Sequence, residues 1–139
     1  MPRTKRKQAI ITGYAKMWPR SVFDLKAANR LIPEIKKLLY ESGVYILYRD
    51  DQPYYVGKAS HLSSRILAHA NRPKDRYYNF WNYFSAFVVP DKRYLREMEG
   101  LLIASMPTEN SSVPRIHKIH LPTRVASLIR SQRIININA

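Results

Sequence analysis

The chain has 139 residues, 45% of them apolar, which suits one self-supporting domain and argues against global disorder. It has no cysteine, which excludes disulfides, thiolate metal ligands and cysteine nucleophiles. Its 24 Lys and Arg against 10 Asp and Glu give a formal net charge of +14, which favours polyanions, above all nucleic acid. Because it has no run of 18 apolar residues and no signal-peptide-like start, we expect a cytoplasmic protein with no membrane partner.

The first third of the chain begins with a basic cluster. Residues 1–20 are expected to form a basic tail that is solvated or contacts DNA phosphates. The next segment, residues 21–42, predicts a packing helix, for which Asp24 is a candidate N-cap and Pro33 marks a start or a kink. The basic cluster consists of Arg3, Lys5, Arg6 and Lys7.

Two short apolar and aromatic runs, 43–48 and 53–57, flank a polar turn and predict a β-hairpin. The number of residues in the turn decides whether the two tyrosines of these runs share a face of the sheet. We expect an odd turn, such as 50–52, because a common site requires a shared face. The pairs expected in this register are Tyr45 with Gly57 and Tyr55 with Leu47.

The second half of the chain predicts a helix, a strand and two further helices. The first helix is expected at about 60–70, and a strand follows within 79–90. Residues 92–106 have the clearest helical periodicity, and a last amphipathic helix is expected from Thr123. The core-facing residues expected on the first two helices are Leu62 and Ile66, then Leu95, Met98, Leu101, Leu102 and Met106. The apolar stripe of the last helix consists of Val125, Leu128 and Ile129.

The last helix has an apolar stripe and a basic side. It is suited to a DNA groove, to a dimer seam or to packing onto the body. We expect a basic tail at 1–20, one folded domain at 21–115 and a C-terminal helical extension at 116–139. The basic side carries Arg124, Arg130 and Arg133.

Glu99 is the most informative single residue. It follows Leu95 by four residues and precedes Leu102 by three, so it borders the apolar stripe, whereas Glu97 points to water. A carboxylate at the edge of a core is costly unless a cation or hydrogen-bond donors meet it. Glu99 is therefore either salt-bridged or a ligand for a hard divalent ion.

Six elements of the chain stand in a suggestive order. The two hairpin tyrosines are ten residues apart, an arginine follows ten residues later, and a histidine lies one helical turn beyond it. Each residue alone has an ordinary interpretation as a strand aromatic or a surface residue. The elements are Gly43-Val44-Tyr45, Tyr55-Val56-Gly57-Lys58, Arg65, His69, Glu99 within "MEGLLIASMPTEN", and Asn110.

This order resembles the GIY-YIG nuclease superfamily over about residues 40–112. Valine replaces isoleucine in both name motifs, and the segment from Glu99 to Asn110 is one residue shorter than in the excision-repair member of the family. The resemblance implies an α+β fold with a three-stranded antiparallel sheet flanked by helices. It also implies phosphodiester hydrolysis with one divalent metal, Mg²⁺ or Mn²⁺.

The resemblance also assigns roles to residues of this chain. It implies that Glu99 holds the metal and that Arg65 binds phosphate oxygens. Tyr45 is the expected general base, with Tyr55 as its rival. His69 orients or relays a proton, Lys58 lowers a tyrosine pKa or binds phosphate, and Asn110 braces the site.

We therefore expect a metal-dependent DNA endonuclease. We lean towards a restriction-type enzyme, which often acts as a homodimer matched to a symmetric site. The alternatives are a repair or structure-specific nuclease and a noncatalytic nucleic-acid-binding module on the same fold.

Overall fold

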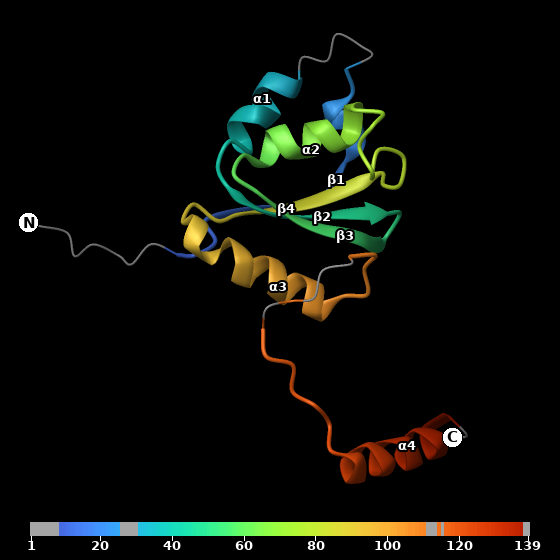
Figure 1. Cartoon of the computed structure of the whole chain (residues 1–139). Helices are drawn as coiled ribbons and strands as arrows, with labels where there is room; N and C mark the ends of the chain where they lie inside the picture. The colour runs from blue at the N-terminus through green and yellow to red at the C-terminus, as the bar shows by residue number, and fades with distance from the viewer. Residues whose placement is uncertain (1–8, 26–30, 111–113, 115, 138–139) are drawn as a thin grey trace, which may run out of the picture.

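The computed structural model describes residues 9–25, 31–110, 114 and 116–137. They form a four-stranded antiparallel sheet with helices on both faces, in the strand order β1-β4-β2-β3 (Figure 1). The predicted α+β class is confirmed, although the sheet has four strands rather than three. The elements are β1 (Gly13–Pro19), the 3-10 turn η1 (Arg20–Phe23), α1 (Leu31–Leu38), β2 (Gly43–Arg49), β3 (Gln52–Ala59), α2 (Leu62–Asn71), β4 (Tyr83–Val88), the 3-10 turn η2 (Lys92–Tyr94), α3 (Leu95–Ser105) and α4 (Thr123–Ile137).

The additional strand is β1, which lies inside the segment expected to be a basic tail. β1 pairs antiparallel with β4, and Trp18 packs edge-on against Phe84 with ring centroids 6.0 Å apart. The aromatic residues of this segment therefore build the sheet edge and part of the core, a role that its positive charge concealed. The basic cluster at Arg3, Lys5, Arg6 and Lys7 lies outside the described residues.

The β2–β3 hairpin has the expected register for a different reason. Tyr45 pairs with Gly57, and Leu47 pairs with Tyr55, as predicted. The turn itself, however, has two residues, Asp50 and Asp51, and Asp50 takes a left-handed φ of 58°. The odd residue is a bulge at Tyr54, because Tyr48 pairs with Pro53.

The two faces of the sheet carry separate clusters of apolar side chains. On one face lie α1, α2 and η1, and α2 buries Leu62 and Ile66 as predicted (Figure 1). The other face is covered by α3, where Leu95, Met98 and Leu102 pack against β2 and β4 residues such as Val44. Leu101 is 53% exposed, so its expected place in the core is wrong.

The segment before β2 differs from the predicted helix. The helix α1 begins only at Leu31, and Asp24 ends η1 rather than capping α1. Pro33 lies in the first turn of α1, where a missing backbone N–H costs no helical hydrogen bond.

The last helix, α4, lies apart from the sheet and its helices (Figure 1). Its apolar residues Val125, Leu128 and Ile129 are 39%, 58% and 40% exposed, so packing onto the body, one of the three contacts considered for this helix, is not what the structure shows. The side chain of Arg133 lies outside the described residues. Within the described chain, no helix has the length and apolar character needed to span a membrane.

Candidate active site

A buried hydrogen bond joins Tyr45 of β2 to His69 of α2. The Tyr45 hydroxyl lies 2.7 Å from His69 Nε2. The tyrosine has no exposed surface and the histidine is 1% exposed. His69 is placed there because it follows buried Ile66 by three residues, on the helix face that packs against the sheet.

Asp75 completes a chain of three side chains, and sequence reasoning missed it. His69 Nδ1 lies 2.8 Å from Asp75 Oδ1, which also accepts the Tyr77 backbone N–H at 2.9 Å. Because a carboxylate accepts from Nδ1–H, the neutral ring presents its Nε2 lone pair to the Tyr45 hydroxyl. No periodicity could have placed Asp75, which lies in the irregular segment between α2 and β4.

Burial sets the protonation states of this chain of side chains. Burial, and then the neighbouring Tyr55, raises the pKa of Tyr45 above its ordinary 10.0, while Arg65 acts in the opposite direction. Burial lowers the pKa of His69 below 6.5, although Asp75 opposes this. Burial acts to raise the pKa of Asp75, but hydrogen bonds from His69 and Tyr77 outweigh it and leave that pKa below 3.8. At neutral pH a protonated tyrosine therefore faces a neutral histidine and an ionised aspartate.

Arg65 brings a cation to the outer side of the Tyr45 hydroxyl. Hydrogen bonding to Tyr45 raises the pKa of Arg65 despite partial burial. Arg65 also lines a surface pocket of about 340 Å³ along α2, together with Lys58 and Arg72. Lys58, Arg65 and Arg72 thus place three positive charges around one pocket, and Arg65 links it to the buried Tyr45–His69 pair. This arrangement suits the anionic oxygens of a phosphate diester.

Tyr55 lies next to Tyr45 but is only partly buried. Its ring stacks on Tyr77 with centroids 4.1 Å apart and lies 6.2 Å from the ring of Tyr45. Burial, and then Tyr77, raises the pKa of Tyr55. Of the two rival tyrosines, Tyr45 is the one in hydrogen-bond contact with a histidine nitrogen, whereas the side-chain hydrogen bond of Tyr55 is to Tyr45.

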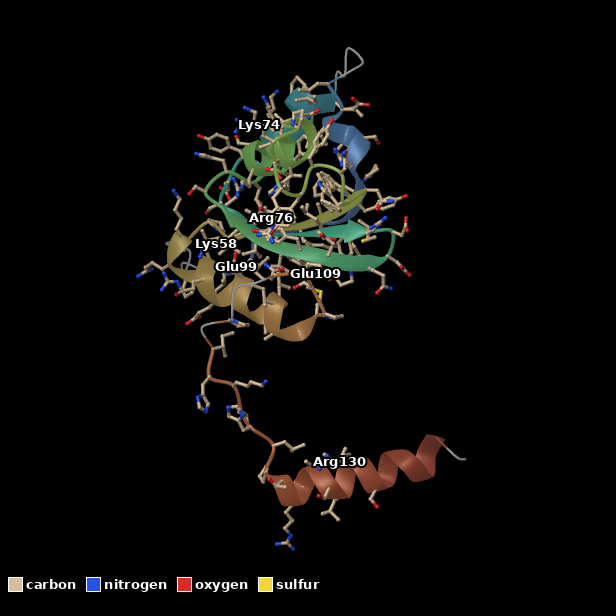
Figure 2. All side chains as sticks on the ribbon, turned by 45° about the vertical axis from the view of Figure 1, so that its right-hand side comes forward. Lys58, Lys74, Arg76, Glu99, Glu109 and Arg130 are labelled. Carbon is tan, nitrogen blue, oxygen red and sulfur yellow. The ribbon has the colours of Figure 1, made fainter. Side chains whose placement is uncertain are left out.

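Glu99 and Lys58 meet across the gap between α3 and β3 (Figure 2). Lys58 Nζ lies 3.7 Å from Glu99 Oε1, and the glutamate side chain is 20% exposed. Glu97 is exposed, as the helical spacing predicted. Glu99 therefore has a cationic partner, and this partner is itself a candidate site residue.

A divalent ion fits Glu99 only as a largely hydrated ion. Among the described residues, no three His, Asp or Glu side chains lie close enough together to hold a metal. Mg²⁺ needs few protein ligands, since it keeps several waters and binds through one or two carboxylates plus substrate phosphate. A lone, half-buried carboxylate beside a basic pocket is compatible with that donor set.

Asn110 pairs with the backbone of the edge strand. Its Oδ1 accepts the Val56 N–H at 2.9 Å, and its Nδ2 donates to the Val56 carbonyl at 2.8 Å. The preceding Glu109 N–H donates to the Tyr54 carbonyl at 2.8 Å. The segment after α3 thereby extends along β3 and fixes the strand between Tyr55 and Gly57.

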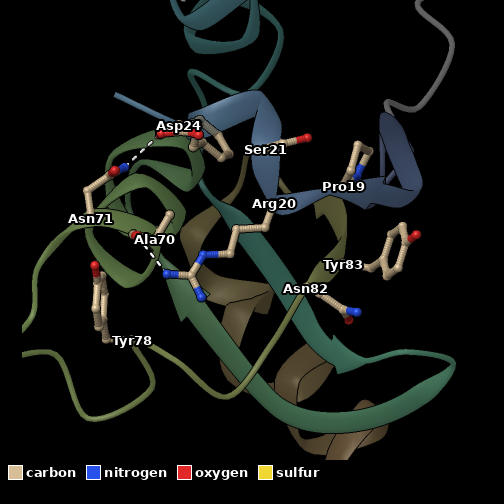
Figure 3. A pocket seen from close by; sticks show the side chains of 10 residues that line it. Pro19, Arg20, Ser21, Asp24, Ala70, Asn71, Tyr78, Asn82 and Tyr83 are labelled. Atoms are coloured by element: carbon tan, nitrogen blue, oxygen red, sulfur yellow. Dashed lines mark hydrogen bonds between the residues drawn. The ribbon is translucent and has the colours of Figure 1, made fainter. Parts of the chain in front are cut away.

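Arg20 of η1 contacts both α2 and the irregular segment 72–82, which carries Asp75 (Figure 3). Its guanidinium donates to the carbonyls of Ala70 at 2.8 Å and Trp81 at 3.2 Å. It also lies 5.1 Å from the Tyr78 ring centroid, beside a pocket of about 380 Å³. Burial lowers the pKa of this guanidinium. The N-terminal strand region therefore contributes to the position of Asp75.

The candidate residues form two groups that meet at the β3 edge. Tyr45, Tyr55, Arg65 and His69 lie on the α2 side of the sheet, whereas Lys58 and Glu99 lie towards α3. Burial and then Tyr77 raise the pKa of Tyr55 most, and the charge of Glu99 adds to this increase from the α3 side. Asn110 contacts the strand that joins them rather than either group.

Comparison with solved structures finds the superfamily that the sequence motifs resemble. Similar structures are those of the GIY-YIG N-terminal endonuclease domain of UvrC from Thermotoga maritima, point mutants bound to the catalytic divalent cation. Each match covers 55% of this chain and 89% of that chain, at a TM-score of 0.43 and 28% or 29% identity. The chain is similar to a GIY-YIG endonuclease domain.

This similarity is limited in extent. No protein-family model matches the chain, and no curated protein sequence matches it. A TM-score of 0.43 is too low to assign a function, which rests instead on the chain's own side-chain contacts.

Proposed function

We propose that the chain is a divalent-metal-dependent DNA endonuclease that hydrolyses phosphodiester bonds at the Tyr45–His69–Asp75 relay. The observation that carries the proposal is this buried relay, with hydrogen-bond distances of 2.7 and 2.8 Å, beside the Arg65 guanidinium. A merely structural tyrosine needs one partner for its hydroxyl. An oriented histidine–carboxylate pair behind it additionally provides a place for a proton to go.

The raised pKa of Tyr45 favours a relay over a free tyrosinate as base. The attacking water gives its proton to the Tyr45 oxygen while the Tyr45 proton moves to His69 Nε2. Tyr45 stays neutral throughout, and the new imidazolium is stabilised by Asp75, 2.8 Å away. The water oxygen bonds to phosphorus, the bond to the leaving oxygen breaks, and that oxygen takes a proton from solvent.

The cations around the relay complement the phosphate. Arg65 offers a planar set of donors to non-bridging oxygens whose charge grows in the transition state. Lys58, 44% exposed, extends the positive surface towards Glu99. Glu99 would hold the divalent ion, which polarises the scissile phosphate and stabilises the leaving oxygen when bound.

Within this class we propose a restriction-type enzyme that acts as a homodimer. Sequence-specific cleavage needs contacts to base edges outside the catalytic centre. The helix α4 lies apart from the catalytic body (Figure 1). Its exposed residues, Arg124 among them, are therefore candidates for such contacts. A structure-specific or repair nuclease is the second candidate, and exposed aromatic side chains beside the relay favour it.

Cleavage of several DNA forms tests the proposal. Purified protein is incubated with supercoiled plasmid, mixed genomic DNAs and branched or gapped oligonucleotides, in Mg²⁺, Mn²⁺ or EDTA. Discrete metal-dependent fragments would support the restriction-type enzyme, and cutting confined to branched or gapped DNA would support the second candidate. Binding without cleavage of any of these substrates would overturn the proposal in favour of a noncatalytic module.

A further inference from the structure

A partly exposed group of aromatic rings lies beside the relay and has no part in the proposed proton transfer. We call Tyr54, Tyr77 and Phe80 the aromatic surface. Tyr54 and Phe80 are stacked, with centroids 5.7 Å apart and ring planes 12° apart. Phe80 is 44% exposed, and the two tyrosines are partly exposed. An exposed, nearly parallel stack leaves apolar ring surface in water, which is costly unless a ligand covers it.

The aromatic surface reaches the candidate active site without a break. Tyr77 stacks on Tyr55 at 4.1 Å, and Tyr54 meets Tyr77 edge-on at 6.3 Å. The β-bulge at Tyr54 is the cause, because it lets neighbouring Tyr54 and Tyr55 both contact Tyr77. A group bound on this surface therefore lies one ring away from the relay.

The exposed charges of segment 72–76, on the Tyr77 side of the aromatic surface, are positive, whereas the exposed acids Asp50 and Glu109 line a pocket with Tyr54 on its other side. Arg72, Lys74 and Arg76 are exposed, and the Arg76 guanidinium carbon lies 5.7 Å from the Tyr77 ring centroid. The acid in this segment, Asp75, is 13% exposed and is held by His69. Flat rings interleaved with cations match a nucleic acid strand, whose bases stack and whose phosphates are anionic.

We propose that the aromatic surface stacks on an unpaired nucleobase next to the scissile phosphate, while Arg72, Lys74 and Arg76 contact the phosphates of the same strand. This inference rests on the proposed nuclease function and, within it, on the second candidate, the structure-specific or repair nuclease. It names the substrate class as DNA with an unpaired or extruded base at the cut site. Paired bases in a duplex bury their faces against their neighbours and present only edges in the grooves. Only an unpaired base can therefore use the exposed face of Phe80.

Binding in EDTA tests the inference separately from catalysis. The full chain is titrated against two labelled oligonucleotide duplexes, one fully paired and one carrying a single unpaired 2-aminopurine. The dissociation constants and the 2-aminopurine fluorescence are measured, since this base is quenched when it stacks. Variants Tyr54→Ala, Phe80→Ala and Phe80→Leu are compared with Tyr14→Ala, a ring 73% exposed on the distant strand β1.

We expect the wild type to prefer the unpaired duplex by about 10-fold and to quench its fluorescence, as one stacked base requires. Phe80→Ala and Tyr54→Ala should reduce this preference several-fold, and Phe80→Leu should also lose the quenching although it keeps apolar area. Tyr14→Ala should keep both. Equal binding to the two duplexes, or quenching that survives in Phe80→Ala, would overturn the inference and favour a protein partner for this surface.

The two proposals fail in different ways. Cleavage of fully paired DNA together with equal binding would remove the stacking role and leave the nuclease. Preferential, quenched binding of the unpaired base without any cleavage would remove the nuclease and leave a single-strand-binding surface.

Discussion

Tyr45 and Gly57 face each other across β2 and β3, and a methyl group on Gly57 would overlap the ring and hydroxyl of Tyr45. The glycine is needed for space rather than for backbone freedom, since none of the described glycines has a positive φ. Gly57 lies within β3, and its missing side chain lets the Tyr45 ring cross the neighbouring strand towards His69.

Gly57→Ala should therefore damage the relay. The added methyl must displace Tyr45, so we expect a loss of about 1–3 kcal/mol in unfolding free energy and a lengthened or broken bond to His69. Urea unfolding and the imidazole nitrogen shifts of His69 would measure both effects. The matched control is Gly13→Ala, because a methyl there has nothing within 4 Å. Equal effects of the two substitutions would contradict this account.

Asp75→Asn should slow cleavage without unfolding the chain. The amide keeps the shape of the carboxylate, but it no longer fixes the Nδ1–H tautomer or stabilises an imidazolium. We expect a fall of about 10²–10⁴-fold in single-turnover rate at pH 7, with little change in DNA binding. Asp51→Asn, in the exposed β2–β3 turn, is the control and should cut normally. A variant at position 75 with the wild-type rate would exclude the relay.

Stability should fall as the solution is acidified. Because burial lowers the pKa of His69 below 6.5, the unfolded chain takes up this proton first, and unfolding free energy decreases as pH falls below about 6.5. The lowered pKa of Asp75 adds a further loss below its ordinary 3.8, as pH falls through the folded value. Unfolding at a series of pH values would test this. His69→Gln should flatten the decrease in unfolding free energy just below pH 6.5, and an unchanged pH dependence in that variant would contradict this account.

Asn110→Ala should loosen the edge strand. The Val56 N–H and carbonyl lose their partners at 2.9 and 2.8 Å, which we expect to cost about 1–2 kcal/mol. Amide hydrogen exchange at Val56 should be faster in this variant. Asn110→Asp should restore the hydrogen bond from the Val56 N–H but not the one to the Val56 carbonyl. Unchanged protection at Val56 in the alanine variant would show that Asn110 does not hold the strand.

The features predicted best from the sequence are those that depend on periodicity. Helical spacing separated half-buried Glu99 from exposed Glu97. The pairing of Tyr45 with Gly57 came instead from the requirement that both tyrosines share one site. Prediction failed where the local sequence pattern does not indicate the structure. The strand β1 was missed because its segment was interpreted from its positive charge alone. The odd turn was wrong because the extra residue lies in a bulge at Tyr54. The apolar stripe of α4 was compatible with a DNA groove, a dimer seam or packing onto the body, and the last of these contacts is not formed.

The parts of the candidate site that the sequence did not predict depend on contacts between residues in different elements. Asp75 is brought to His69 by the irregular segment 72–82. Arg20, fifty-five positions before Asp75, donates hydrogen bonds to Trp81 in this segment and to Ala70 in α2. No spacing rule connects residues in such a segment to a helix face. The aromatic stack of Tyr54 and Phe80 is hidden from sequence in the same way, because it joins β3 to that segment.

The most direct measurement is the single-turnover cleavage rate of Glu99→Gln beside Glu97→Gln, in Mg²⁺, with DNA binding measured in EDTA. Both substitutions remove one charge from α3, but only Glu99 faces Lys58 and the basic pocket. We predict that Glu99→Gln abolishes cleavage and keeps DNA binding, whereas Glu97→Gln cuts at the wild-type rate. Metal-dependent cleavage by Glu99→Gln at the wild-type rate would contradict the account, because the metal would then have to bind elsewhere.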